Sequence, residues 1–362
     1  MDTQTHPNAS GRDNGRPLRC GVVGVGRMGR HHARAYAQRP DVELVGVVDT
    51  DPKRRAEIAE QHGTRPFATE AELLDAGVDA VSIAVPTVYH LDASRGFLER
   101  GIGCLIEKPL AQDTDTAQQM KSLAERSGAC LMVGHIERFN PVIRAVQSLE
   151  AKGMSVAPRF VDVQRVSPMT FRSVDVGVVM DMMIHDVDVV LMLMGAVEPV
   201  SVEASGVSVV TEHEDICNAR LTFETAWGPA VANLSASRLA MKTERVTRIT
   251  GESGYIKIDY AAKKGTAIHR TANESQRQEV AEQLRQGKDL SDLDWSELVN
   301  IEPLDVTQAD QLEMEIDAFL GAIRTGEQPP SDAGSGLANV RTAERIVDAT
   351  RSFLAKIGHT TG

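Results

Sequence analysis

The stretch Gly24-Val25-Gly26-Arg27-Met28-Gly29 decides how this chain folds. It follows an apolar run, residues 18–23, and leads into residues 30–36, which are predicted to begin a helix. In such a strand–turn–helix unit the first glycine allows a sharp turn, the second lets the backbone approach a pyrophosphate, and the third lets helix and strand pack closely. The free N–H groups at the helix start attract phosphates. The stretch therefore predicts a dinucleotide-binding turn.

The next apolar run, residues 42–48, ends on Asp49, which lies 20 residues after Gly29. A carboxylate at about this distance is expected to accept a hydrogen bond from a ribose 2′-hydroxyl. The same carboxylate would repel a 2′-phosphate, so Asp49 favours NAD over NADP. NADP remains the less favoured alternative, because Lys53, Arg54 and Arg55 begin the next predicted helix.

Composition narrows the class of protein. The chain has 362 residues, of which 42% are hydrophobic and 25% charged, as is typical of a globular protein. Its net charge of −12 argues against non-specific nucleic-acid binding. No apolar run has the length needed to span a membrane, and residues 1–16 are polar and predict a disordered tail rather than a secretory signal. The four cysteines form no CxxC pair, which favours a cytoplasmic protein with buried thiols.

From residue 18 to about residue 134, predicted strands and helices alternate. This pattern predicts an α/β fold with a doubly wound parallel sheet, in which ligands bind at the carboxyl ends of the strands. Those ends carry the glycine turn, Asp49, Pro86-Thr87 and Glu107-Lys108-Pro109. The predicted cofactor-binding residues are Gly24, Gly26, Arg27, Met28, Gly29, Asp49, Pro86, Thr87, His90, Glu107 and Lys108.

After about residue 159 the pattern changes to alternating polar and apolar residues in strands joined by short turns. This predicts an α+β domain with a large open, mostly antiparallel sheet, whose exposed face would suit a homodimer or homotetramer. Residues 271–300 are polar and predict a surface insertion with one short helix. The expected divisions are a tail at 1–16, a dinucleotide-binding domain at 17–135, a substrate and oligomerisation domain at 136–335 and a C-terminal helix at 336–362.

One predicted helix, residues 178–194, interrupts these strands and carries Asp181, His185 and Asp188 at spacings of four and three residues. The three fall on one face of a helix that is otherwise apolar, where charges are costly unless they are paired or used. They could form a structural pair. They could bind a metal, but no further His or Cys has matching ligand spacing, so no metal is expected. They could also perform acid–base chemistry, with Asp181 orienting His185 as it takes a proton from a substrate hydroxyl.

Together these features resemble the Gfo/Idh/MocA family of NAD(P)-dependent oxidoreductases. The resemblance rests on the glycine turn with Asp49, on Glu107-Lys108-Pro109 and on Asp181 with His185, and it extends over residues 18–357. It implies a Rossmann domain followed by an α/β domain with a large open sheet. It also implies that Lys108 and His185 flank the reacting carbon with Asp181 alongside, and that the bond before Pro109 is cis.

Residues 134–141 resemble the members that oxidise the 3-hydroxyl of UDP-N-acetylglucosamine or its uronic acid to a 3-keto sugar. In that case Arg138 and Asn140 would meet a diphosphate at a helix start, and Arg165 and Arg172 would add charge. Arg138 could instead form an interdomain salt bridge. The predicted substrate-binding residues are Lys108, Arg138, Asn140, Arg165, Asp181 and His185.

Three other functions remain open. A free-sugar or inositol-type dehydrogenase would need no diphosphate clamp. An NAD-dependent glycosidase of the same family would oxidise C3 only transiently and release a leaving group. A non-catalytic NAD-binding sensor would need Asp49 and the glycines but neither Lys108 nor His185, so the presence of both disfavours it.

Overall fold

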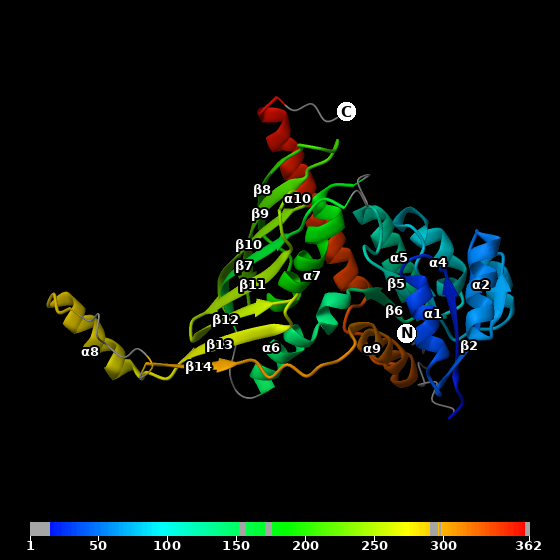
Figure 1. Cartoon of the computed structure of the whole chain (residues 1–362), viewed down its shortest axis with the longest axis horizontal. Coiled ribbons are helices and arrows are strands. Elements are labelled where there is room, and N and C mark those ends of the chain that lie inside the picture. Colours follow the sequence, from blue (N-terminus) through cyan, green and yellow to red (C-terminus); the bar gives the residue numbers. More distant parts are fainter. Residues whose placement is uncertain (1–14, 152–156, 171–175, 290–295, 297, 359–362) are drawn as a thin grey trace, which may run out of the picture. The chain divides into compact units, whose positions relative to one another are not determined.

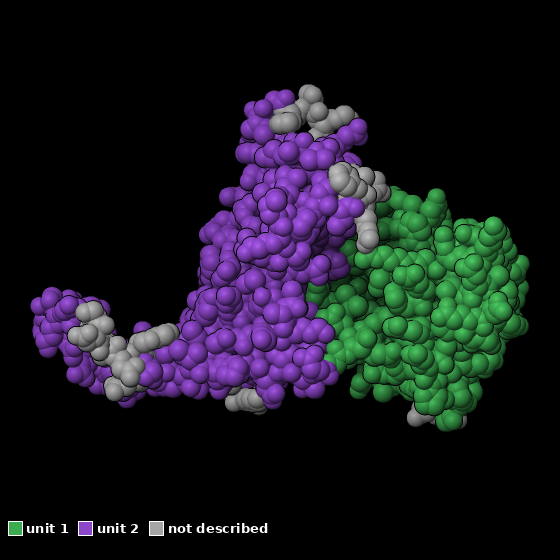
Figure 2. Space-filling model, in the orientation of Figure 1, with its two compact units in different colours: residues 1–139, 309–344 green, residues 140–308, 345–362 purple. Residues whose placement is uncertain are grey.

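The computed structural model describes residues 15–151, 157–170, 176–289, 296 and 298–358. Most of the expected N-terminal tail and Arg172 lie outside these residues. The chain forms two compact units, shown in different colours in Figure 2. Unit 1 comprises residues 1–139 and 309–344, and unit 2 comprises residues 140–308 and 345–362.

Unit 1 contains the predicted doubly wound parallel sheet, with strand order β3-β2-β1-β4-β5-β6. The strands are β1 Leu18–Val23, β2 Val42–Val48, β3 Arg65–Phe67, β4 Ala80–Ile83, β5 Gly103–Glu107 and β6 Leu131–Gly134. The helices are α1 Gly29–Ala37, α2 Pro52–His62, α3 Glu70–Asp75, α4 His90–Glu99, α5 Thr114–Ser127 and α9 Gln311–Thr325, with short helices η1 Thr87–Tyr89 and η2 Ile136–Phe139. The fold class expected for this part of the chain is confirmed.

Helix α9 belongs to unit 1, although the sequence grouped residues 309–335 with the second domain. The reason is its apolar face. Ile316, Phe319 and Leu320 are fully buried and pack in one core cluster with Cys20 and Val22 of β1. A second cluster contains Val23, Ile83 and Ile106. Two clusters that draw on the same strands show that the sheet is covered on both faces.

Unit 2 contains an eight-stranded sheet of order β14-β13-β12-β11-β7-β10-β9-β8. Every neighbouring pair is antiparallel except β7 and β10, so the expectation of a mostly antiparallel sheet is confirmed. The strands are β7 Pro158–Val166, β8 Ser201–Val207, β9 Ile216–Thr225, β10 Gly228–Ser237, β11 Glu244–Gly251, β12 Gly254–Asp259, β13 Lys264–Arg270 and β14 Val299–Pro303. The helices are α6 Pro141–Ala151, η3 Val179–Met183, α7 Ile184–Leu193 and α8 Glu274–Arg285; α10 Ala333–Lys356 begins in unit 1 and ends in unit 2.

One face of this sheet is covered and the other is exposed. Along β9, Cys217, Ala219 and Leu221 are buried and alternate with exposed residues. Helix α7 contacts β7 and β10, and Figure 1 shows it on the covered side. Helix α8, the short helix expected in the polar insertion, has no buried residue and lies beyond the ends of β13 and β14 (Figure 1). In the described residues, no helix has both the length and the apolar character that a membrane crossing requires.

Candidate active site

The glycine turn between β1 and α1 has little room for side chains. A Cβ atom on Gly29 would lie 1.7 Å from the carbonyl oxygen of Gly24, and a Cβ atom on Gly24 would lie 2.8 Å from that of Ala84. Gly24 also has φ of +82°, which disfavours other residues. A Cβ atom on Gly26, in contrast, would meet nothing within 4 Å. The turn and the packing require Gly24 and Gly29, whereas Gly26 leaves an open cradle that fits a pyrophosphate.

A pocket of about 750 Å³ opens at the carboxyl ends of the unit 1 strands. Eight predicted cofactor residues line it: Gly24, Gly26, Arg27, Met28, Asp49, Pro86, Glu107 and Lys108. Three others do not line it, namely Gly29, Thr87 and His90. The pocket therefore brings together the glycine turn, the ribose carboxylate and the lysine that the sequence singled out.

Asp49 is held rigidly at the end of β2. Its side chain is buried, and its two oxygens accept hydrogen bonds from the backbone N–H groups of Val25, at 3.0 Å, and of Asp51, at 2.9 Å. The Nη1 atom of Arg54 lies 3.4 Å from both oxygens. This ion pair was not predicted, although Arg54 lies five residues after Asp49, within the first turn of α2. The carboxylate is thus oriented by two backbone groups and partly neutralised by one cation.

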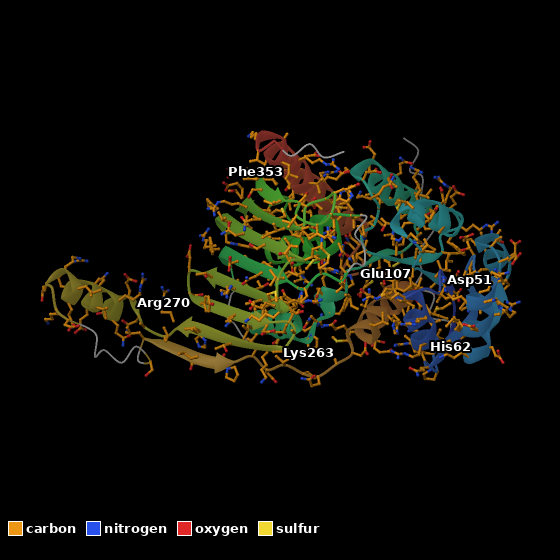
Figure 3. All side chains as sticks on the ribbon, turned by 45° about the horizontal axis from the view of Figure 1, so that its top comes forward. Asp51, His62, Glu107, Lys263, Arg270 and Phe353 are labelled. Atoms are coloured by element: carbon orange, nitrogen blue, oxygen red, sulfur yellow. The ribbon has the colours of Figure 1, made fainter. Side chains whose placement is uncertain are left out.

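Glu107 belongs to a largely buried network of side-chain hydrogen bonds. The phenol oxygen of Tyr36 lies 2.8 Å from the Ser82 hydroxyl, which lies 3.0 Å from Nδ1 of His32. Nε2 of His32 lies 3.2 Å from Oε1 of Glu107. Burial raises the pKa of Glu107, but the hydrogen bond from His32 and the charges of His32 and Lys108 outweigh it, so that this pKa lies below its usual value. Glu107, labelled in Figure 3, therefore stays ionised beside Lys108.

Tyr36, Ser82 and His32, which form this hydrogen-bond network with Glu107, were not predicted to be functional. His32 and Tyr36 lie four residues apart on the buried face of α1, and Ser82 lies on β4. Polar side chains at that spacing on an apolar helix face are the signal that could have found them.

His90 lies behind the wall of the pocket rather than in it. It is 1% exposed, and its Nε2 lies 3.0 Å from the carbonyl oxygen of Val85. Its Nδ1 lies 3.0 Å from the carbonyl oxygen of Pro109 and 3.2 Å from that of Leu110. Burial lowers the pKa of His90. The peptide bond between Lys108 and Pro109 is cis, as the resemblance implied.

In unit 2, the helix that carries Asp181 and His185 differs from the prediction. The expected single α-helix begins as the π-helical segment η3, in which the N–H of Ile184 donates to the carbonyl of Val179. The helix expected over about residues 178–194 is therefore present, but its first turns are π-helical. Asp181 and His185 are half-buried, while Asp188 is buried. Single π-helical turns inside α-helices occur frequently at functional sites.

Glu214 fixes the start of this helix. Its Oε1 accepts a hydrogen bond of 3.2 Å from the N–H of Val179, and its carbonyl accepts one of 3.0 Å from the N–H of Val178. A Cβ atom on Gly177 would lie 1.9 Å from the same Oε1. Arg238 donates to the Glu214 carbonyl and forms an ion pair of 3.1 Å with the buried Asp215. Glu214, Asp215 and Arg238 were not predicted, because each lies more than 30 residues from Val179 in sequence.

The cations expected to meet a diphosphate contact protein groups. Arg165 on β7 forms a buried ion pair with Asp186, in which Nε to Oδ2 measures 2.7 Å and Nη2 to Oδ1 measures 2.8 Å. Arg138, in unit 1, is buried and donates to the carbonyl of Pro330. Oδ1 of Asn140, in unit 2, accepts a hydrogen bond of 3.2 Å from the N–H of Val142 at the start of α6. Their contact with substrate remains a prediction.

No group of three or more His, Cys, Asp or Glu side chains able to hold a metal ion occurs among the described residues. The glycine cradle, the buried Asp49 and the adjacent Lys108 define the class of protein as a dinucleotide-dependent oxidoreductase.

Comparison with known proteins identifies the family. The model of the oxidoreductase family with an NAD-binding Rossmann fold matches residues 18–135, and that of the GFO/IDH/MocA C-terminal domain matches residues 157–257. This chain belongs to the Gfo/Idh/MocA family of oxidoreductases.

Two curated relatives show how far the similarity extends. The chain is 35% identical over 339 residues to UDP-N-acetylglucosamine 3-dehydrogenase of Acidithiobacillus ferrooxidans, covering 94% of this chain and 99% of the relative. A solved structure of that enzyme has a TM-score of 0.80 and covers 93% of this chain and 98% of its own. An inositol 2-dehydrogenase of Rhizobium meliloti is 28% identical over 247 residues, covering 66% of this chain and 74% of the relative.

Proposed function

We propose that this chain is an NAD-dependent dehydrogenase that oxidises the 3-hydroxyl of a UDP-N-acetylhexosamine, or of its uronic acid, to a 3-keto sugar. The observation that carries the proposal is the similarity to UDP-N-acetylglucosamine 3-dehydrogenase, which extends over nearly the whole of both chains. The inositol 2-dehydrogenase matches only about two thirds of this chain. Lys108, Asp181 and His185, to which we assign the catalytic roles, are all present.

The residues of unit 1 fit NAD. The space beside Gly26 would admit the pyrophosphate. The oriented carboxylate of Asp49 would accept a hydrogen bond from a ribose hydroxyl. Bound NAD would supply the hydride acceptor, C4 of its nicotinamide ring. Lys108 lines the same pocket at the end of β5, where a cation can stabilise negative charge on a substrate oxygen.

Oxidation of an alcohol removes a proton as well as a hydride. We assign His185 as the general base that removes the proton from the substrate hydroxyl. Its side chain is half-buried. Asp181, four residues earlier, would orient His185 and stabilise its charged form. Lys108 would stabilise the developing alkoxide.

The substrate is tested by adding UDP-N-acetylglucosamine, its uronic acid, free N-acetylglucosamine or myo-inositol to the enzyme with NAD and recording NADH absorbance. NADH formation with a UDP-sugar and none with the free sugar or inositol supports the proposal. Reduction by free sugars or inositol alone contradicts it. Release of a leaving group without net NADH would indicate the glycosidase instead.

The catalytic roles are tested by Lys108→Met and His185→Ala, which should abolish turnover while leaving NAD bound. The matched controls are Lys257→Met and His269→Ala on β12 and β13 of unit 2, which should retain turnover. Full activity in Lys108→Met or His185→Ala would refute the assigned role.

A second candidate is an inositol-type or free-sugar dehydrogenase. It is favoured by the contacts of Arg165 and Arg138, because Asp186 and the Pro330 carbonyl already engage cations expected to bind a diphosphate. Arg138→Lys distinguishes the two. If Arg138 reaches a diphosphate, KM for the UDP-sugar should rise about tenfold or more, the effect of a lost charged hydrogen bond. An unchanged KM would favour the second candidate.

We further propose that the exposed face of the unit 2 sheet associates two or four copies of this chain. Phe160 and Ile216, both more than a third exposed, lie on β7 and β9 of that sheet. Light scattering of the purified protein tests the proposal. A monomer at micromolar concentration would contradict it.

A further inference from the structure

The hydrogen-bond network of unit 1 ends at the carboxylate beside Lys108. Tyr36 and His32 lie on α1, Ser82 lies on β4, and Glu107 lies at the end of β5. Tyr36, His32 and Ser82 are at most 1% exposed, whereas Glu107 lines the cofactor pocket. Polar groups are costly to bury unless they are bonded to one another. The three buried members take no part in the proton and hydride steps assigned above, so their role is open.

The hydrogen bonds of this network have one consistent direction. Burial raises the pKa of Tyr36 well above its ordinary value, so the phenol keeps its proton and donates it to the Ser82 oxygen 2.8 Å away. The Ser82 hydroxyl can then donate to Nδ1 of His32 at 3.0 Å. A neutral imidazole that accepts at Nδ1 carries its proton on Nε2, which lies 3.2 Å from Oε1 of Glu107. Tyr36 and Ser82 thus orient His32 as a donor to Glu107.

Glu107 depends on this donor to stay ionised. Burial raises the pKa of its carboxyl group, but the bond from His32, the charges of His32 and Lys108 and the backbone N–H of Lys108 together lower it below its usual value. His90 on α4 also faces the carboxylate, since the charge of Glu107 acts on the pKa of His90. Attraction between two charges is mutual, so an ionised Glu107 in turn favours the cationic form of Lys108.

The network is built to hold a charge in place and not to conduct protons to water. Its far end is Tyr36, whose fully buried phenol has Ser82 as its one side-chain hydrogen-bond partner among the described residues. We propose that His32 is a positioning residue, oriented by Ser82 and Tyr36, which holds Glu107 as a fixed carboxylate so that Lys108 stays cationic and in place. The inference rests on the proposed function, which takes Lys108 as the cation that stabilises the alkoxide.

The matched variants are His32→Asn and His32→Gln. Both introduce an amide, but the glutamine N–H can reach the position of Nε2 and donate to Glu107, whereas the shorter asparagine reaches only the position of Nδ1. His31→Asn is the control, because His31 is the half-buried neighbour of His32 on α1 and does not line the cofactor pocket. Any effect specific to the bond between His32 and Glu107 should appear in His32→Asn and be reversed in His32→Gln.

The first measurement uses the full chain without cofactor or substrate. The carboxyl carbon of Glu107 is followed by ¹³C NMR as the pH is lowered from neutral, and is assigned by its absence in Glu107→Gln. In the wild type and in His31→Asn it should titrate below the ordinary 4.5. In His32→Asn it should titrate at least about one pH unit higher, because a hydrogen bond and a nearby charge are lost. His32→Gln should regain part of that shift.

The second measurement is turnover with the UDP-sugar and NAD. His32→Asn should lower kcat by about tenfold or more, since the cation at the alkoxide is displaced, while the KM for NAD changes much less. The decline of kcat on acidification should also begin at a higher pH than in the wild type. His32→Gln should recover most of kcat, which loss of stability alone does not predict.

An unshifted Glu107 titration in His32→Asn, or equal kcat in His32→Asn and His32→Gln, would overturn the inference. Should both variants fail to fold, ¹⁵N NMR of the wild-type His32 ring decides, because a neutral ring protonated on Nδ1 would also overturn it. A wild-type protein that oxidises no sugar would instead overturn the proposed function and the role given to Lys108. The titration of Glu107 separates the two failures, because it is measured without substrate.

Discussion

His90 joins the ends of two neighbouring strands, because its Nε2 lies 3.0 Å from the carbonyl oxygen of Val85 and its Nδ1 lies 3.0 Å from that of Pro109. Val85 follows β4, and Pro109 follows Lys108 at the end of β5. A residue expected to touch the cofactor thus links the backbone just after the candidate catalytic lysine to the end of the neighbouring strand β4. We infer that His90 influences turnover by fixing the position of Lys108.

The stability contributed by His90 should depend on pH. Burial lowers its pKa from the ordinary 6.5 in the folded protein, so between the two values the unfolded chain binds a proton that the folded one does not. The contribution of His90 to the free energy of unfolding should therefore be greatest above pH 6.5 and should decrease as the pH drops below 6.5. In His90→Gln, urea unfolding should show a shallower loss from pH 7 to pH 5 than in the wild type. An identical slope in the two proteins would show that His90 does not titrate in this way.

His90→Leu tests its positioning role. It should cost about 1–3 kcal/mol, because buried carbonyl oxygens lose their donor. It should also lower kcat more than it raises the KM for NAD, since Lys108 shifts while Asp49 does not. A proportionate change in both constants would mean that the effect is general destabilisation.

Alanine substitutions at two glycines of the dinucleotide turn should have different effects. Gly29→Ala places a methyl group 1.7 Å from the Gly24 carbonyl, which is backbone and cannot rotate away, so the protein should unfold at markedly lower urea concentration. Gly26→Ala meets nothing within 4 Å and should keep its stability. It should nevertheless lose NAD affinity, by about tenfold or more, because the methyl group occupies the pyrophosphate cradle. Normal NAD binding by Gly26→Ala would place the cofactor elsewhere.

Gly177 should be needed for the helix that carries Asp181 and His185. In Gly177→Ala the new methyl group would lie 1.9 Å from Oε1 of Glu214, so the carboxylate must move and lose its bond to the Val179 N–H. A shift of the catalytic helix of about 1 Å can lower turnover by roughly a hundredfold. We expect kcat to fall towards that extent while NAD affinity, which unit 1 provides, is retained.

The double variant Gly177→Ala with Glu214→Ala separates the clash from other effects. Because the carboxylate is absent, adding the methyl group should cost little beyond Glu214→Ala alone. Gly321→Ala is the control, since its methyl group would meet nothing within 4 Å. Additive losses in the double variant would show that Gly177 acts independently of Glu214.

Local signals made much of unit 1 predictable. The bounds of helix α5 follow from local signals, because the Asp113 side chain caps its start by accepting from the Thr116 N–H and Gly128 ends it in the left-handed conformation. Strand β3 was missed: it has three residues, two of them exposed, and contains Pro66. Strand β14 was missed because its residues are mostly polar or exposed within a polar insertion.

Residues of the candidate site could be predicted where their spacing along the sequence indicates their role. Asp49 and Lys108 could be located by their distance from the glycine turn and their position at strand ends. The π-helical start of the Asp181 helix could not, because it depends on Glu214, which lies more than 30 residues away in sequence. Arg165 likewise has the charge of an anion-binding residue, and only the tertiary fold pairs it with Asp186.

That pairing leads to the last prediction. Arg165 and Asp186 are 4% and 2% exposed, and they share two hydrogen bonds of 2.7 and 2.8 Å. Removing one partner leaves the other as a buried unpaired charge, so Asp186→Ala and Arg165→Ala should each destabilise the protein by about 3–5 kcal/mol. Replacing both by apolar residues of similar size, as Arg165→Met with Asp186→Leu, should cost less than either single change, because no buried charge remains. Urea unfolding at pH 7 measures all three variants. If the double variant loses as much as the sum of the single variants, the two residues are not an isolated pair, and other protein groups, such as the Tyr260 ring 6.0 Å from the Arg165 guanidinium, contribute to its stability.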